Sequence, residues 1–144
     1  SRKESFYMAA ALLLEFILCN LFLKPLFFRV RPYTVGPAIL LLEAPADGSF
    51  PSGHTGSAFA CIAALFLCRS RWRWPSLAVG LVIAWSRLYF YFHFPTDVLG
   101  GVILGVAAAY AGTFLAVRFA GKSPAALRFL ALSEDDPAPE SIQI

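Results

Sequence analysis

The chain has 144 residues, of which 58% are hydrophobic and 15% are charged, and its formal net charge is +3. A soluble globular domain is nearer half apolar and a quarter charged, so this composition favours a protein embedded in a membrane. The length is sufficient for one domain, and the apolar runs described below argue against a nucleic-acid partner. The three cysteines, an odd number, indicate no complete disulfide framework.

Apolar runs of near-spanning length occur four times along the chain: Phe6–Leu23, Thr55–Cys68, Pro75–Phe92 and Val98–Val117. About 20 helical residues cross the hydrocarbon core of a bilayer, so the second run is short for a span. The sequence predicts an all-α, polytopic membrane helical bundle with four spans, forming one domain over residues 1–132. The acidic, proline-bearing segment 133–144 is predicted to be a disordered cytoplasmic tail.

Basic residues predict the orientation of these spans. If four helices cross alternately, eight of the twelve basic residues lie on one side: Arg2, Lys3, Arg69, Arg71, Arg73, Arg118, Lys122 and Arg128. By the positive-inside rule that side is the cytoplasm, which predicts a multi-pass protein of the plasma membrane. The remaining basic residues fall on or near the outer face: Lys24, Arg29, Arg31 and Arg87. An anionic ligand on that face would explain their position.

Two further features of the spans concern helix packing. Glu15 lies in the middle of the first run, where a charge is costly. We expect it to be protonated, or paired with a polar group on a helix outside this sequence, and a functional role is the alternative. Small residues recur at four-residue intervals in the fourth run and predict close helix contacts: Gly101, Gly105, Ala109 and Thr113.

Side chains suited to chemistry gather in three segments: Lys24–Pro32, Pro51–His54 and Ser86–Asp97. If the four helices cross the membrane alternately, all three segments lie on the outer face. Lys24, Arg31 and Arg87 supply three fixed cations, and guanidinium groups match phosphate oxygens in a bidentate manner. The start of the second span, at Ser52 and Gly53, offers free N–H groups and the positive end of a helix dipole. The segments therefore predict a phosphate-binding site.

The two histidines can divide the chemistry of phosphoryl transfer between them. His93 is the candidate nucleophile, because Asp97, four residues further on, can hold its second ring nitrogen. His54, beside a helix N-terminus, suits the general acid that protonates the leaving oxygen. Phosphoryl transfer otherwise needs positioning and charge stabilisation, which the cations supply.

Taken singly, each of these residues also has a purely structural interpretation. Arg31 can pair with Glu43 or Asp47. Ser52 and Asp97 can cap the second and fourth spans, since both precede apolar helical runs. Together, these interpretations leave unexplained why both histidines and three of the four outer cations gather on one face.

The three segments, in order, read Lys-x6-Arg-Pro, Pro-Ser-Gly-His and Ser-Arg-x5-His-x3-Asp. This pattern resembles the three-part signature of the type 2 phosphatidic acid phosphatase superfamily in order and in every fixed position. The resemblance implies a helical bundle and a phosphohistidine on His93, with His54 as general acid and Asp97 as the partner of His93. It implies no metal or other cofactor, and it assigns phosphate binding to Lys24, Arg31, Ser52, Gly53 and Arg87.

Membrane members of that superfamily usually have six helices, of which this chain would carry the last four. Its compact layout and outward-facing site look most like undecaprenyl-diphosphate phosphatases, which implies conversion of undecaprenyl diphosphate to undecaprenyl phosphate. Phosphatidylglycerophosphate and phosphatidic acid phosphatases share the signature and are the alternatives. A non-catalytic lipid-phosphate-binding membrane protein is the alternative from a different class, and the apolar runs argue against a soluble vanadium haloperoxidase. The expected partners are a lipid phosphate and the bilayer, and the oligomeric state stays open.

Overall fold

The computed structural model describes residues 1–36, 43 and 45–123, and these residues form helices and connecting segments without a strand. The all-α class is therefore confirmed for this part of the chain. The predicted domain end at residue 132 and the predicted tail 133–144 lie outside the described residues. The helical elements described are α1 (Arg2–Phe16), the π-helix η1 (Ile17–Leu23), α2 (Lys24–Phe27), α3 (Pro32–Val35), α4 (Gly53–Leu67), α5 (Arg73–Tyr89) and α6 (Pro95–Ala120).

The chain begins with one long helix built from three consecutive elements. Ser1 caps α1, because its hydroxyl accepts from the Glu4 N–H while the Glu4 side chain reaches back to the Ser1 backbone. The helix then continues through η1 into α2, since the joining residues keep helical dihedral angles. The wide turns of the π-helix end immediately before Lys24. Phe28, with φ of 26°, follows as the C-cap of α2.

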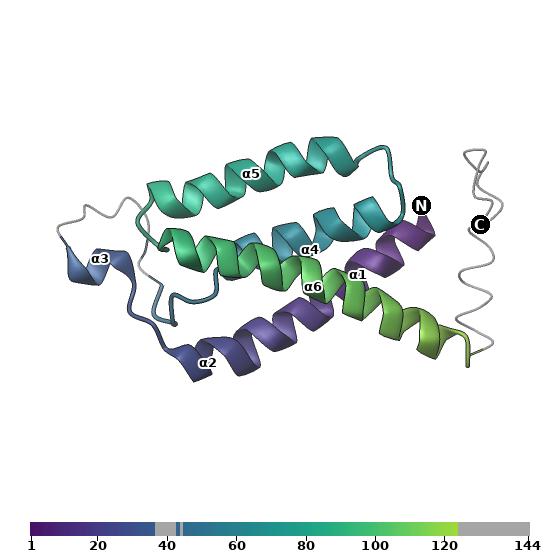
Figure 1. Ribbon diagram of the computed structural model, residues 1–144, viewed down its shortest axis with the longest axis horizontal. Coiled ribbons are helices and arrows are strands. Elements are labelled where there is room, and N and C mark those ends of the chain that lie inside the picture. The colour runs from purple at the N-terminus through teal and green to yellow at the C-terminus, as the bar shows by residue number, and fades with distance from the viewer. Residues whose placement is uncertain (37–42, 44, 124–144) are drawn as a thin grey trace.

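Short turns connect α4, α5 and α6. After α4, Arg69 adopts a left-handed conformation with φ of 51°, and the Ser70 N–H donates to the Leu65 carbonyl at 3.0 Å, which closes the helix as a Schellman motif. Pro95 opens α6, where its missing N–H costs nothing. The start of α4, the end of α5 and the start of α6 thereby reach one end of the molecule, at the left in Figure 1, where α2 and α3 also lie.

Small side chains let α6 pack closely against both α4 and α1. The core cluster consists of alanines: Ala11, Ala60, Ala63, Ala64 and Ala109. A Cβ added at Gly105 would lie 2.3 Å from the Gly56 carbonyl oxygen on α4, and one added at Gly112 would lie 2.7 Å from the Ala10 carbonyl oxygen on α1. The small residues of α6 thus form the helix contact that their spacing predicts, and α1 and α6 cross in Figure 1.

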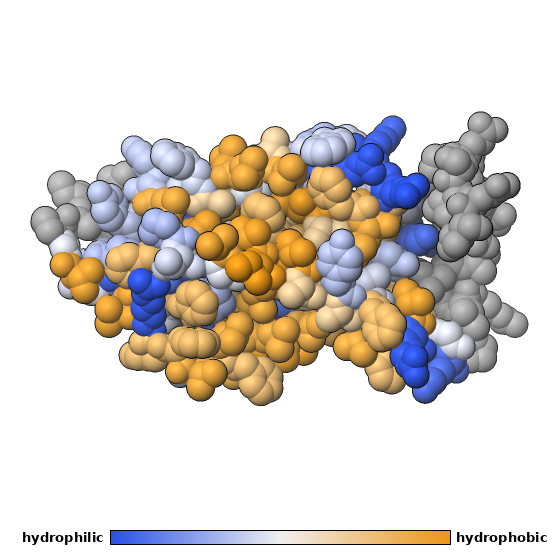
Figure 2. Space-filling view, in the orientation of Figure 1, coloured by the Kyte–Doolittle hydropathy of each residue, from blue (hydrophilic) through white to orange (hydrophobic). Residues whose placement is uncertain are grey.

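Two helical stretches of the described chain are long and apolar enough to cross a membrane, namely residues 2–35 and α6. α4 is apolar but has 15 residues, and α5 has 17, so both are shorter than the roughly 20 residues of a full span. Two of the four predicted spans therefore meet this criterion. In Figure 2 hydrophobic residues cover the middle of the visible face, and hydrophilic residues gather towards the right-hand end.

Glu15 has its polar partner within this chain rather than on a helix outside it. The side chain is 1% exposed, and the Ser57 hydroxyl of α4 donates to its Oε2 at 2.8 Å. Its Oε1 lies against Gly56, where an added Cβ would come within 2.3 Å, and has no hydrogen-bond partner among the described residues. Glu15 therefore joins α1 to the first turns of α4, close to the candidate site.

Candidate active site

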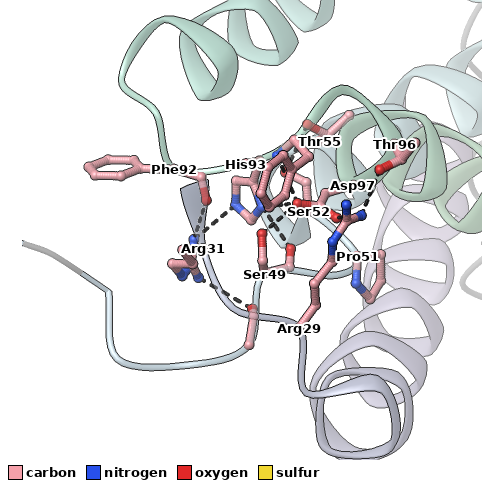
Figure 3. A network of polar contacts seen from close by, with 12 residues as sticks. Arg29, Arg31, Ser49, Pro51, Ser52, Thr55, Phe92, His93, Thr96 and Asp97 are labelled. Carbon is pink, nitrogen blue, oxygen red and sulfur yellow. Dashed lines mark hydrogen bonds and ion pairs between the residues drawn. The ribbon is translucent and has the colours of Figure 1, made fainter. Parts of the chain in front are cut away.

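The predicted site residues lie at the end of the molecule where the helices α4, α5 and α6 meet the segment after α2 (Figures 1 and 3). His93 lies in the turn between α5 and α6, and Asp97 lies in the first turn of α6. Arg31 comes from the segment between α2 and α3, and Ser52 immediately precedes α4. Residues distant in sequence are thus brought together by the ends of the helices.

His93 is buried, with 5% of its surface exposed, and its two ring nitrogens have different environments. Nδ1 lies 2.7 Å from the carbonyl oxygen of Ser49. Because a carbonyl can only accept, Nδ1 carries the proton and Nε2 keeps its lone pair. Nε2 lies 3.3 Å from Nη1 of Arg31 (Figure 3). Burial and the nearby Arg31 charge lower the pKa of His93 to about 4, so the ring is neutral at neutral pH.

Asp97 is fully buried but does not directly hold His93 as the sequence predicted. Its Oδ2 is 3.8 Å from Nδ1 of His93, beyond hydrogen-bond distance. Oδ2 instead accepts from the Ser49 hydroxyl and from the Phe94 N–H at 2.8 Å, which is a helix-capping contact. Oδ1 accepts from Nη1 of Arg29 at 2.9 Å. Asp97 therefore reaches His93 through Ser49, whose hydroxyl binds Asp97 and whose carbonyl binds the imidazole.

Arg31 is 4% exposed and is held by backbone oxygens and by Asp47. Its Nη1 donates to the Phe92 carbonyl at 2.9 Å, and its Nη2 donates to Asp47 Oδ1 at 2.6 Å. The second oxygen of Asp47 pairs with Lys24. Partial burial raises the pKa of Asp47, but the bonds from Lys24 and Arg31 outweigh this, so its pKa lies below the ordinary value and it is ionised at neutral pH.

The remaining predicted residues surround the start of α4. A Cβ at Gly53 would lie 3.8 Å from Nζ of Lys24, so this cation lies over the first turn of the helix. The Ser52 hydroxyl is 3.0 Å from the Thr55 hydroxyl and caps no backbone N–H. His54 lies at the surface, and partial desolvation of its ring, together with the nearby charges of Arg87, Lys24 and Arg31, lowers its pKa below the ordinary value.

A profile of the PAP2 superfamily matches residues 4–120. The chain belongs to the PAP2 superfamily. Similar proteins include undecaprenyl-diphosphatase BcrC of Bacillus subtilis, 30% identical over 110 residues that cover 76% of this chain and 56% of that protein. The undecaprenyl-diphosphatase of Sulfolobus acidocaldarius is 34% identical over 79 residues, covering 54% of this chain and 38% of that protein. The lipid A 4'-phosphatase of Bacteroides thetaiotaomicron is 28% identical over 145 residues, covering 93% and 60%. The chain spans about half the length of these relatives.

Arg29 also contacts the candidate site, although the sequence placed it only among the four outer cations and gave it no separate role. Its Nη1 donates to the Thr96 hydroxyl at 2.6 Å as well as to Asp97, and its guanidinium lies 4.3 Å from the centre of the Phe94 ring. The only feature of the sequence that pointed to Arg29 was its position among the four basic residues of the outer face. Ser49 carried no such signal, because it acts partly through its backbone carbonyl, which every residue possesses.

In this PAP2 chain the arrangement provides the parts that a phosphoryl transfer needs. A neutral imidazole keeps Nε2 unprotonated beside a guanidinium, a lysine lies at a helix N-terminus, and an exposed second histidine lies close by. Within the described residues, no three His, Cys, Asp or Glu side chains gather as a metal site would require. The site can therefore hold an anion between its cations and present a nitrogen nucleophile to it.

Proposed function

We propose that this protein hydrolyses a lipid phosphate or diphosphate through a phosphohistidine intermediate on His93. The observation that carries this proposal is the pair of contacts made by the His93 ring. Nδ1 lies 2.7 Å from the Ser49 carbonyl, which assigns the proton to Nδ1, and Nε2 lies 3.3 Å from Nη1 of Arg31. A histidine with this tautomer can attack phosphorus without first losing a proton. The attack would place the phosphoryl group directly beside Arg31.

The proposed reaction has two steps. Nε2 of His93 attacks phosphorus, the bond from phosphorus to the leaving oxygen breaks, and His54 donates a proton to that oxygen. Water then attacks the phosphorus of the phosphohistidine, the bond between phosphorus and Nε2 breaks, and His54 takes up a proton of the water. Inorganic phosphate leaves, and His93 is free again. Asp97 would stabilise the charge on the imidazole through Ser49, since it is connected to His93 by that residue.

Phosphate binding is assigned in this proposal to the three cations and the start of α4. Lys24, Arg31 and Arg87 would neutralise the equatorial oxygens. Ser52 and Gly53 would contribute the N-terminus of α4, where Lys24 already lies close to Gly53. The residues that bind the phosphoryl group are therefore distinct from those proposed to move the proton.

Undecaprenyl diphosphate is the substrate we favour, giving undecaprenyl phosphate. Two relatives named undecaprenyl-diphosphatase support this choice, and a relative named lipid A 4'-phosphatase supports the wider class of lipid phosphates. Phosphatidylglycerophosphate and phosphatidic acid are the alternatives. A non-catalytic protein that binds lipid phosphates would retain the cations but would not need a second histidine.

We further propose that the chain contributes four spans to a plasma-membrane protein whose membrane domain has six. α4 and α5 would then cross with their polar ends in the interfacial regions, since each is shorter than the hydrocarbon core requires. The basic residues at the start of α1, at the start of α5 and at the end of α6 would face the cytoplasm, and the site would face outwards.

Phosphate release from the complete protein, purified in detergent with EDTA, tests the reaction. The substrates are undecaprenyl diphosphate, phosphatidylglycerophosphate, phosphatidic acid and 4-nitrophenyl phosphate. We expect a preference for undecaprenyl diphosphate and loss of at least about 1,000-fold in kcat for His93→Ala, since removal of a nucleophile abolishes the covalent route. His54→Ala serves as the matched comparison: its defect should be larger for phosphatidic acid, whose alkoxide leaving group needs a proton, than for 4-nitrophenyl phosphate, whose leaving group does not.

Full activity of His93→Ala would refute the phosphohistidine mechanism. Absence of phosphate release from every substrate, by a folded protein that still binds the lipids, would instead favour the non-catalytic binder. A preference for a different lipid phosphate would retain the mechanism and change the substrate.

A further inference from the structure

Asp47 forms ion pairs with two of the cations assigned to the phosphoryl group. Oδ1 accepts from Nη2 of Arg31 at 2.6 Å, and Oδ2 pairs with Lys24. Two oxygens of a phosphoryl group would present the same pair of acceptors to the same two donors. The Asp47 carboxylate therefore occupies the position in which an anion would bind Lys24 and Arg31.

The guanidinium of Arg31 is already saturated by acceptors from the described part of the chain. Nε donates to the Asp47 carbonyl at 3.0 Å, and Nη1 donates to the Phe92 carbonyl at 2.9 Å and faces Nε2 of His93. Nη2 donates to the Asp47 carboxylate at 2.6 Å and to the Gly48 carbonyl at 3.4 Å. A phosphate oxygen can reach Nη2 only when the carboxylate leaves it, because the new acceptor must take the place of the old one.

Exposure differs greatly between the members of this ion-pair cluster. The Asp47 side chain is 49% exposed, whereas those of Lys24 and Arg31 are 13% and 4% exposed. Asp47 can therefore turn out into water, where a carboxylate is well solvated. The buried Arg31 cannot follow, and a buried charge without a partner is costly. Departure of Asp47 is thus favourable only when another anion arrives.

We propose that Asp47 is a built-in competing anion that sets the affinity of Lys24 and Arg31 for phosphate. The phosphoryl group of the substrate displaces the carboxylate, and the returning carboxylate displaces inorganic phosphate after the reaction. Asp47 thereby determines which anions are accepted, since an anion with a single charge gains less from this exchange than a dianion. The inference rests on the proposed function only in taking Lys24 and Arg31 to bind phosphate.

Binding of inorganic phosphate to the complete protein in detergent, measured by isothermal titration calorimetry, tests this directly and without turnover. We expect Asp47→Asn to bind phosphate roughly tenfold more tightly than the parent, because two competing ion pairs are lost. Glu43→Gln is the matched control, since it removes one charge from an exposed residue of the same connection, and should change the affinity less than twofold. In kinetics, the inhibition constant of phosphate should fall by the same factor for Asp47→Asn.

Phosphate binding by Asp47→Asn that is unchanged or weaker would overturn the proposal, and so would failure of both parent and variant to bind phosphate. Asp47→Ser provides a second variant if the amide does not fold. If both variants unfold, Asp47 is a structural anchor and the proposal is overturned. Tighter binding in a protein that hydrolyses no lipid phosphate would support this proposal and refute the proposed function. Hydrolysis of a lipid phosphate by the parent, without tighter phosphate binding by Asp47→Asn, would support the proposed function and overturn the role of Asp47.

Discussion

The tautomer of His93 depends on the backbone carbonyl of Ser49. The Asp97 carboxylate, which was expected to set the tautomer directly, reaches His93 only through Ser49. Ser49 binds the imidazole through its carbonyl and Asp97 through its hydroxyl, so its position determines both contacts. A carbonyl is a weaker stabiliser of an imidazolium than a carboxylate, because it carries no net charge. His93 is therefore held in the neutral state that a nucleophile requires.

The acid limb of the pH profile should reflect this neutral state. Burial and Arg31 lower the pKa of His93 to about 4, from an ordinary value near 6.5. Protonation removes the lone pair of Nε2, so we expect kcat/KM to be retained from neutral pH downwards and lost as the pH falls through about 4. Phosphate release measured between pH 3 and 8 tests this. Loss of activity around pH 6.5 would show either that His93 is not the group that must be deprotonated, or that its ring is far more exposed to water than in this structure.

Arg29 should matter through its contact with Asp97. Without it, Asp97 loses a charged partner and becomes free to approach Nδ1 of His93, now 3.8 Å away. We expect Arg29→Met to lower kcat/KM by roughly 10- to 100-fold, in line with the cost of small misplacements of reacting groups. It should also move the acid limb to higher pH, since an uncompensated carboxylate favours the imidazolium.

Arg29→Lys should recover part of the activity, because it restores the charge without the planar fork. Arg118→Met, which removes an exposed arginine at the far end of α6, is the matched control and should leave both quantities unchanged. An Arg29→Met protein with reduced activity but an unmoved acid limb would argue for a purely structural contact.

At the scale of elements, the site depends on how closely α4 approaches α6. His54 lies in the first turn of α4 and Asp97 in the first turn of α6, and the Ser52 N–H donates to the Asp97 carbonyl at 3.0 Å. Glycines of α6 allow this approach, because Gly101 and Gly105 lie directly against the α4 backbone. The separation of the two helices therefore sets the distance between the proposed acid and the proposed nucleophile.

Gly105→Ala should force these helices apart. Its Cβ would lie 2.3 Å from the Gly56 carbonyl oxygen and 2.8 Å from the Ala60 nitrogen, and backbone atoms cannot yield as a flexible side chain does. We expect a loss of about 1–3 kcal/mol in the free energy of unfolding, typical of overpacking, together with reduced activity. Thermal unfolding in detergent provides the measurement. Gly121→Ala is the control, since its nearest neighbour is an ordinary 3.5 Å away, and equal effects of both variants would contradict this account.

The elements also show why the sequence predicted some features better than others. Apolar runs indicate helices whatever their neighbours, so α1, α4, α5 and α6 were all expected, with ends displaced by a few residues. The run predicted to end at Phe92 stops as α5 at Tyr89, because the turn into α6 takes up the following residues. The seven-residue π-helix before Lys24 was not expected. A continuous run of apolar residues is compatible with both an α-helix and a π-helix, so the sequence does not distinguish them.

At the scale of the whole molecule, the two ends differ in charge and in chemistry. The site cations lie at one end, whereas Arg71 and the N-terminus lie close together at the other. If the site faces outwards, a membrane-impermeant maleimide should label Val35→Cys in intact cells, because Val35 is 65% exposed at the site end. Arg71→Cys, also exposed, should be labelled only after permeabilisation, and the parent with its native cysteines sets the background. The reverse pattern would invert the proposed orientation.

The candidate site was predictable where its side chains stand at fixed spacing. The motif residues around Lys24, His54 and His93 were identified in this way, and the fold brings them to one end of the molecule (Figure 1). The contacts made by Ser49 and Arg29 were not, because they depend on the path of connecting segments that spacing does not determine. The sequence allowed Arg31 to pair with either Glu43 or Asp47, and in the structure Arg31 pairs with Asp47.

The π-helix also determines the direction in which Lys24 points relative to the side of the first helix that packs in the core. Its turns are wider than those of an α-helix, so each residue of Ile17–Leu23 advances the chain around the helix axis by less than the ~100° of an α-helical residue, and this sets the direction of Lys24 relative to Glu15 and Ala11. Those two residues face the helices against which α1 packs, and Lys24 faces the start of α4. The angle between the packing side of the helix and Lys24 therefore depends on the π-helical form of this segment. If the same seven residues formed an α-helix, Lys24 would point away from the start of α4, and another cation would be needed to complete the site.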